Sequence, residues 1–97
     1  MSGKAEWLRI APDHPALAGH FPNAPIVPGA LLLDQVLHSI DPTATLWHIA
    51  SVKFHRIVQP SESLQLESRP QANGELRIEI YAAQALVMSA SIERRGP

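Results

Sequence analysis

The spacing of hydrophobic residues changes once along this chain, and that change limits the fold more than any other feature. Residues 30–40 (ALLLDQVLHSI) have the period of an amphipathic α-helix. From residue 47 onward, apolar and polar residues alternate as they do in β-strands. One helix followed by a series of strands predicts an α+β fold, in which an antiparallel sheet covers the helix.

The predicted helix is apolar around most of its circumference, which is typical of a buried helix that other elements wrap. Its main stripe is formed by Ala30, Leu33, Leu37 and Ile40, widened by Leu32 and Val36. We expect strands at residues 6–11, 47–58, 63–68, 75–82 and 85–93. Turn signals at Gln59-Pro60-Ser61-Glu62 and Asn73-Gly74 make the connections between the later strands short. Short connections favour antiparallel neighbours, so we predict about five antiparallel strands around one central helix.

Composition excludes several classes of protein. The chain has 97 residues, no cysteine and a formal net charge of −1, which excludes disulfides, thiolate metal sites and a basic nucleic-acid surface. No apolar run is long enough to span a bilayer, and the N-terminus lacks the apolar region of a signal peptide. We therefore expect residues 1–97 to form a single cytoplasmic domain. So small a domain gains from covering apolar surface with a partner, so we also expect an oligomer.

The residues best suited to chemistry lie within residues 19–38 (GHFPNAPIVPGALLLDQVLH). His20 belongs to a loop that prolines at positions 22, 25 and 28 make rigid, as a positioned catalytic group requires. Asp34 is the single carboxylate of the predicted helix. His38 follows Asp34 by four residues, but two ligands are too few for a metal ion, so we expect no metal site.

This stretch resembles the active-site signature of the hotdog-fold 3-hydroxyacyl-[acyl-carrier-protein] dehydratases. Their pattern runs Gly-His-Phe-Pro-Gly, a short gap, then a hydrophobic residue with Pro-Gly, and a carboxylate five residues after that glycine. GHFPNAPIVPGALLLDQV has the histidine, both prolines, Gly29 and the carboxylate at matching spacing. SVKFHRIVQPSESLQLE is similar to the family's long strand, proline turn and next strand, so the resemblance covers residues 7–93.

The resemblance implies a fold, a site and a partner. In this family an antiparallel sheet wraps one long helix, two subunits pair edge to edge, and the active site lies between them. His20 matches the catalytic histidine and Asp34 the catalytic carboxylate, contributed by the other subunit. Gly29 matches the glycine whose backbone N–H binds the thioester carbonyl. The implied partner is an acyl carrier protein with a phosphopantetheine-linked acyl chain, and no cofactor is implied.

The chemistry explains these residue types. Dehydration of a 3-hydroxyacyl thioester requires a base for the C2 proton and an acid for the leaving C3 hydroxyl. A histidine can be neutral near neutral pH and act as the base. A carboxyl group on a buried helix surface can keep its proton, because burial disfavours the charged form. A backbone N–H at a helix N-terminus can stabilise the enolate-like oxygen.

Three positions depart from the family pattern. Asn23 replaces the glycine of the histidine loop, and His38 replaces the usual glutamine. Asp34 replaces the glutamate of the commoner branch, as it does in the branch that also isomerises an enoyl intermediate.

From the signature and its chemistry we predict a dehydratase of fatty-acid or polyketide-like synthesis. The alternatives are a non-catalytic acyl-binding or partner hotdog subunit, which could form hetero-oligomers, and a hotdog acyl thioesterase.

Other residues have simpler interpretations. Phe21, Trp47 and Phe54 are expected to belong to the core or to an acyl tunnel wall. His48 and His55 are expected on a solvated sheet face. Lys53, Arg56, Arg94 and Arg95 could contact an acidic carrier protein, although solvated charges are the default interpretation.

Overall fold

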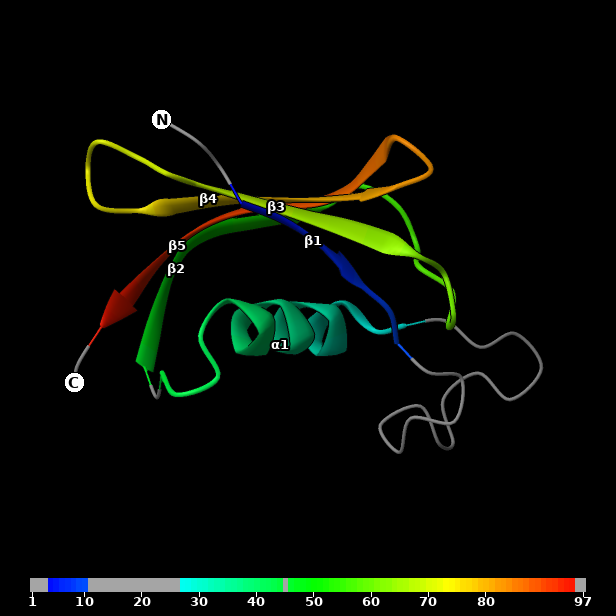
Figure 1. Cartoon of the computed structure of the whole chain (residues 1–97), viewed down its shortest axis with the longest axis horizontal. Helices are drawn as coiled ribbons and strands as arrows, with labels where there is room; N and C mark the ends of the chain where they lie inside the picture. Colours follow the sequence, from blue (N-terminus) through cyan, green and yellow to red (C-terminus); the bar gives the residue numbers. More distant parts are fainter. Residues whose placement is uncertain (1–3, 11–26, 45, 96–97) are drawn as a thin grey trace.

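The described part of the chain forms a five-stranded antiparallel sheet with one helix against it. The computed structural model describes residues 4–10, 27–44 and 46–95. Their elements are β1 (Lys4–Leu8), α1 (Gly29–Ile40), β2 (Leu46–Phe54), β3 (Leu64–Pro70), β4 (Leu76–Ala82) and β5 (Ala85–Arg95). Figure 1 shows α1 lying along one face of the sheet. The predicted combination of one helix and five antiparallel strands is therefore confirmed.

The strand order is β1-β3-β4-β5-β2, which places β1 and β2 at the two edges. β3, β4 and β5 are joined in sequence as hairpins. Ala83 and Gln84 connect β4 to β5 and have φ angles of 49° and 71°, the backbone that a two-residue type I′ turn requires. β2 pairs with β5, so β2 and β3 are not neighbours despite the short connection between them. Among the described strands, the long strand β2 therefore has a neighbour on one side only.

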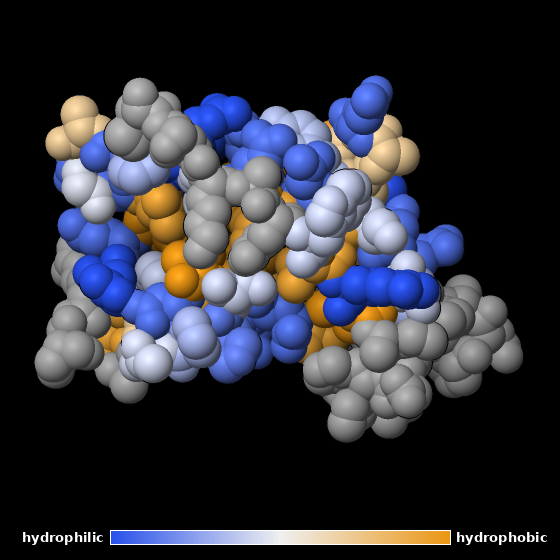
Figure 2. Space-filling model, viewed as in Figure 1, coloured by the Kyte–Doolittle hydropathy of each residue, from blue (hydrophilic) through white to orange (hydrophobic). Residues whose placement is uncertain are grey.

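The hydrophobic core lies between α1 and the sheet. Leu32 and Val36 are the buried residues of the helix, and they face buried side chains from β3, β4 and β5. Ala30, Asp34 and His38, spaced four residues apart, are exposed on the opposite side of α1. The predicted stripe was therefore wrong at Ala30, because the sheet covers one side of the helix only and the buried side is centred on Leu32. In Figure 2, which has the same viewpoint as Figure 1, some hydrophobic side chains are visible at the surface.

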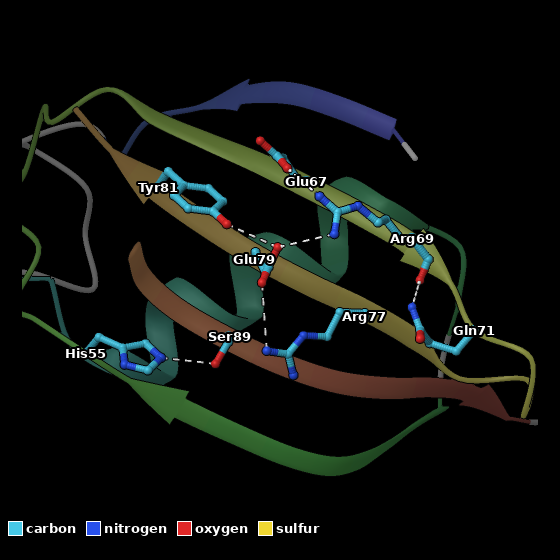
Figure 3. A network of polar contacts seen from close by, with 8 residues as sticks. All are labelled: His55, Glu67, Arg69, Gln71, Arg77, Glu79, Tyr81 and Ser89. Carbon is cyan, nitrogen blue, oxygen red and sulfur yellow. Dashed lines mark hydrogen bonds and ion pairs between the residues drawn. The ribbon is translucent and has the colours of Figure 1, made fainter. Parts of the chain in front are cut away.

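The face of the sheet away from α1 is polar (Figure 3). Arg69 and Arg77 approach the Glu79 carboxylate at 3.7 and 3.8 Å, and the Tyr81 hydroxyl donates a 3.1 Å hydrogen bond to it. Partial burial, and secondly the bond to Glu79, raise the pKa of Tyr81 above its ordinary value. The exposed His55 forms a 3.1 Å hydrogen bond with Ser89 on this face, as expected for a solvated sheet face. The polar side chains named here thus form ion pairs and hydrogen bonds with one another across this face.

Two strand ends differ from the prediction by more than two residues. β1 ends at Leu8, and the prediction had continued it to residue 11. β2 ends at Phe54 rather than at residue 58, because the chain then leaves the sheet edge and the Val58 carbonyl accepts a 2.7 Å hydrogen bond from the Val27 N–H. This bridge ties the segment after β2 to the segment that enters α1.

At the C-terminal end of α1, an aspartate carboxylate forms hydrogen bonds that depend on its charge. Asp41 is the C-cap, and its carboxylate accepts hydrogen bonds from the Thr43 hydroxyl and N–H, at 2.7 and 3.0 Å, and from Arg94. The Thr43 hydroxyl bond, followed by the Arg94 bond, lowers the pKa of Asp41 from its ordinary value of 3.8. A lowered folded-state pKa means that the ionised carboxylate stabilises the fold above the unfolded-state pKa, and that this contribution disappears as pH falls through the folded value.

Replacing Asp41 by asparagine is therefore expected to lower Tm near neutral pH. The difference in Tm between wild type and Asp41→Asn should shrink in strong acid, once the pH has fallen through the lowered folded-state pKa and the wild-type carboxyl is also neutral. Thermal unfolding followed by circular dichroism at both pH values measures this. An equal difference at both pH values would show that the charge of Asp41 contributes nothing to stability.

Candidate active site

The candidate site begins at the first turn of α1. Gly29 is the first helical residue and Pro28 occupies the N-cap, with no side-chain hydrogen bond capping the helix. The Pro28 carbonyl already accepts from the N–H groups of Leu31 and Leu32, at 3.0 and 3.1 Å. Proline before the first turn suits the helical backbone but provides no side-chain acceptor. Pro28 therefore offers no side chain to accept from the first N–H groups of α1, which lie at the positive end of its dipole.

A pocket of about 380 Å³ opens beside this helix start. Its lining residues come from the segment entering α1, from α1 itself and from the end of β2, and they are Val27, Pro28, Gly29, Leu32, Phe54, His55, Arg56, Ile57 and Val58. Val27, Leu32 and Val58 are buried and belong to the core, whereas Phe54 is 46% exposed. The arrangement can hold an apolar group next to a helix N-terminus.

Asp34 lies farther along α1 on its exposed side. Five residues separate it from Gly29, which corresponds to about 7.5 Å along the helix axis. The sequence led us to expect a carboxyl on a buried helix surface, and this is wrong for the single chain, because the sheet covers the other side of α1. His38 is also exposed, and no hydrogen bond joins it to Asp34 in the described structure. None of the residues in the described part of the chain buries Asp34.

His20, Asn23 and Phe21 lie outside the described residues, so the expected meeting of His20 with Asp34 stays a prediction. Among residues 4–10, 27–44 and 46–95, no group of three metal-ligating side chains lies together. In the same part of the chain, no helix has both the length and the apolar character needed to cross a bilayer. Gly29 and Asp34 are thus the two predicted site residues whose positions are known.

Two of the four basic residues named as possible carrier contacts are paired within the chain. Arg56 lies at the pocket and contacts the Glu62 carboxylate at 2.6 Å. The hydrogen bond from Arg56 is the main cause that lowers the pKa of Glu62. Arg94 pairs with Asp41 at the far end of α1.

The sequence did not indicate that Val27, Ile57 and Val58 would line the pocket. Nothing in the local pattern shows that the segment entering α1 forms a bridge with the segment after β2.

Comparison with solved structures defines the class of protein. The dehydratase heterocomplex ApeI:P from Xenorhabdus doucetiae contains a chain that superposes with a TM-score of 0.79 at 25% identity, covering 96% of this chain and 88% of that one. A point mutant of the fluoroacetyl-CoA-specific thioesterase FlK superposes with a TM-score of 0.58 at 11% identity, over 94% and 82% of the two chains. The fold is therefore the hotdog fold, as predicted.

Sequence comparison then defines the family. The family model described as ApeI-like, ApeI dehydratase, matches residues 4–91. Curated relatives include the 3-hydroxyacyl-[acyl-carrier-protein] dehydratases FabZ of Rickettsia typhi, 32% identical over 61% of this chain, and of Actinobacillus succinogenes, 32% identical over 65% of it. The chain spans about half the length of these relatives, 49% and 53%. The chain belongs to the ApeI-like dehydratase family, which confirms the resemblance to hotdog-fold dehydratases.

Proposed function

We propose that this protein removes water from 3-hydroxyacyl thioesters, giving trans-2-enoyl thioesters. The observation that carries the proposal is the uncapped start of α1 at Gly29 beside an apolar pocket, with Asp34 following on the same helix. Family membership and the match of His20, Gly29 and Asp34 to the dehydratase signature support it. We include a carrier-protein substrate and a cytoplasmic location in the proposal, on the strength of the resemblance and the FabZ relatives.

In the proposed reaction the Gly29 N–H donates to the thioester carbonyl oxygen. His20 takes the proton from C2, and the electron pair of that bond forms the C2–C3 double bond as the C3–O bond breaks. Asp34 protonates the leaving hydroxyl, which departs as water, and the proton on His20 later restores the acid. Each step is ordinary acid–base chemistry assisted by a donor at the developing oxyanion.

We further propose that two hotdog chains join through β2. This edge strand has nine residues, pairs only with β5 among the described strands, and exposes Leu46, Ile49, Val52 and Phe54. Ile49, Val52 and Phe54 pair with Ile92, Ala90 and Met88 of β5, which are all buried, so they share the sheet face that α1 covers. The register shift between Ile49 and Ser51 keeps these apolar residues on one face. A free edge beside an exposed apolar row favours pairing with another chain.

We include in the proposal that the second chain also covers the exposed side of α1, which carries Asp34. The second chain is either an identical copy or a different hotdog subunit. A structural relative was solved as a dehydratase heterocomplex, which supports the alternative of a different subunit. In a hetero-oligomer this chain could bind acyl groups without turning them over alone. We favour the active homodimer, because the signature residues are present in one sequence.

The test is the product formed from a 3-hydroxyacyl-carrier substrate. We expect the purified protein to give enoyl thioester, detected by mass spectrometry and by the absorbance of the conjugated double bond. No product from the protein alone, with product appearing only after a second hotdog subunit is added, would favour the partner-subunit alternative. Release of free acid instead of enoyl thioester would identify a thioesterase and exclude the proposal.

A further inference from the structure

The pocket beside Gly29 has a fixed floor and an exposed wall, which residues 54–57 form. Val27, Leu32 and Val58 on the floor are 5%, 2% and 3% exposed and are held by the core. Phe54 forms a wall from the last position of the edge strand, where almost half of its surface is exposed. A floor of packed core side chains cannot adjust its volume without cost, whereas an exposed side chain at a strand end can. Phe54 is therefore one of the wall residues through which the pocket can change its size.

The Phe54 ring covers the first residue of α1. A Cβ atom placed on Gly29 would lie 2.9 Å from Cζ of Phe54 and 3.1 Å from each of Cε1 and Cε2. The tip of the ring therefore occupies the space that any side chain at position 29 would need. Gly29 has an ordinary helical backbone, which other residues can also adopt. Glycine suits this position because it has no side chain that would collide with the ring. The glycine and the ring together form one closed corner of the pocket.

We infer that Phe54 sets the size of the acyl group that this site accepts. This inference rests on the proposed function, since a thioester carbonyl held at the Gly29 N–H places the start of the acyl chain in this pocket. With Phe54 in place, the ring limits the space beyond the helix start. Without the ring, the corner joins the pocket and a longer or bulkier acyl group fits. Phe54 is a specificity-determining residue and takes no part in proton transfer.

The test compares wild type, Phe54→Ala and the control Trp7→Ala on short and long 3-hydroxyacyl-carrier substrates. Trp7 matches Phe54 as an exposed aromatic residue of an edge strand, but it lies on β1 and does not line the pocket. We expect Phe54→Ala to raise the long-to-short ratio of kcat/KM by about tenfold or more, the range that a change in hydrophobic pocket size produces. The control should keep the wild-type ratio. The ratio does not depend on the active fraction of each preparation.

An unchanged ratio in an active Phe54→Ala protein would overturn the inference. If wild type dehydrates no substrate, the proposed function fails instead, and the pocket is then tested by the affinities of short and long acyl-pantetheine amides for the same three proteins. Phe54→Ala should again shift the preference toward the longer chain, and an equal preference in all three would overturn the inference.

A stability measurement tests the contact itself. Gly29→Ala should lower the denaturation midpoint in the wild-type background, because the new methyl group meets the ring. In the Phe54→Ala background the same change should be neutral or raise the midpoint, because alanine favours helix more than glycine does. Equal shifts in both backgrounds would show that the ring does not occupy this corner.

Discussion

His20→Ala and Asp34→Asn are each expected to lower kcat for dehydration by about 10²–10⁴-fold, the typical contribution of a positioned acid or base. Neither change should unfold the protein. Asp34 is exposed on α1, and asparagine keeps its size. The double variant should be little worse than either single variant, because the two groups act in one step. Steady-state kinetics with circular dichroism on the same samples measures both properties.

The matched control for these variants is His38→Gln. His38 lies on the same exposed side of α1 as Asp34, one turn farther along, and glutamine is the residue that the related dehydratases usually have there. We expect this variant to stay close to wild-type activity. A loss as large as that of Asp34→Asn would show that the helix surface, rather than the carboxylate, is what the reaction needs. Full activity of both His20→Ala and Asp34→Asn would contradict the assignment of the site.

Mixing the two inactive variants tests whether the site lies between chains. In a mixed dimer of His20→Ala with Asp34→Asn, an intersubunit site would regain one intact pair of catalytic groups. Random pairing should then restore up to about a quarter of the wild-type sites, since half of the dimers are mixed and one site of two is intact. A site built within one chain would regain nothing, so absence of recovery after verified subunit exchange would place His20 and Asp34 in the same chain.

The second large effect is expected at the free edge of β2. Val52 is 38% exposed on the helix-side face of this strand, and in a two-fold dimer each copy would bury one Val52. Val52→Lys removes two buried valines and adds two like charges. It should weaken the dimer by about tenfold or more in Kd. Only the exposed 38% of each Val52 remains to be buried, so the two copies lose about 1–2 kcal/mol of apolar burial, and the two lysines add repulsion. Sedimentation at several protein concentrations measures the change.

Trp7→Lys is the control for the dimer. It places the same charge on β1, at the opposite edge of the sheet, where Trp7 is exposed. This variant should remain dimeric. If Trp7→Lys dissociates the protein and Val52→Lys does not, the chains join through β1 and the proposed arrangement is wrong. Dehydration should fall together with dimer content in Val52→Lys and recover at high protein concentration, as an intersubunit site requires.

The local elements were predictable because each follows from a pattern of neighbouring residues. The helix at residues 30–40 was predicted within one residue of α1, and the Asn73-Gly74 signal marks the turn where Gly74 has a φ of 88°. The end of β2 was placed four residues too late. Val58 falls at an even spacing from Val52 and Phe54, which extended the predicted strand, but in the structure Val58 forms a bridge to Val27 outside the sheet.

The sequence by itself determined the family, the helix, the strands and the candidate residues His20, Gly29 and Asp34, because motif spacing and hydrophobic period are properties of short segments. The tertiary structure alone decided which residues meet. It placed β2 at an edge beside β5, left Asp34 on the uncovered side of α1, and brought the Phe54 ring against Gly29. These contacts join segments far apart in the chain and depend on how whole elements pack, so no local pattern encodes them.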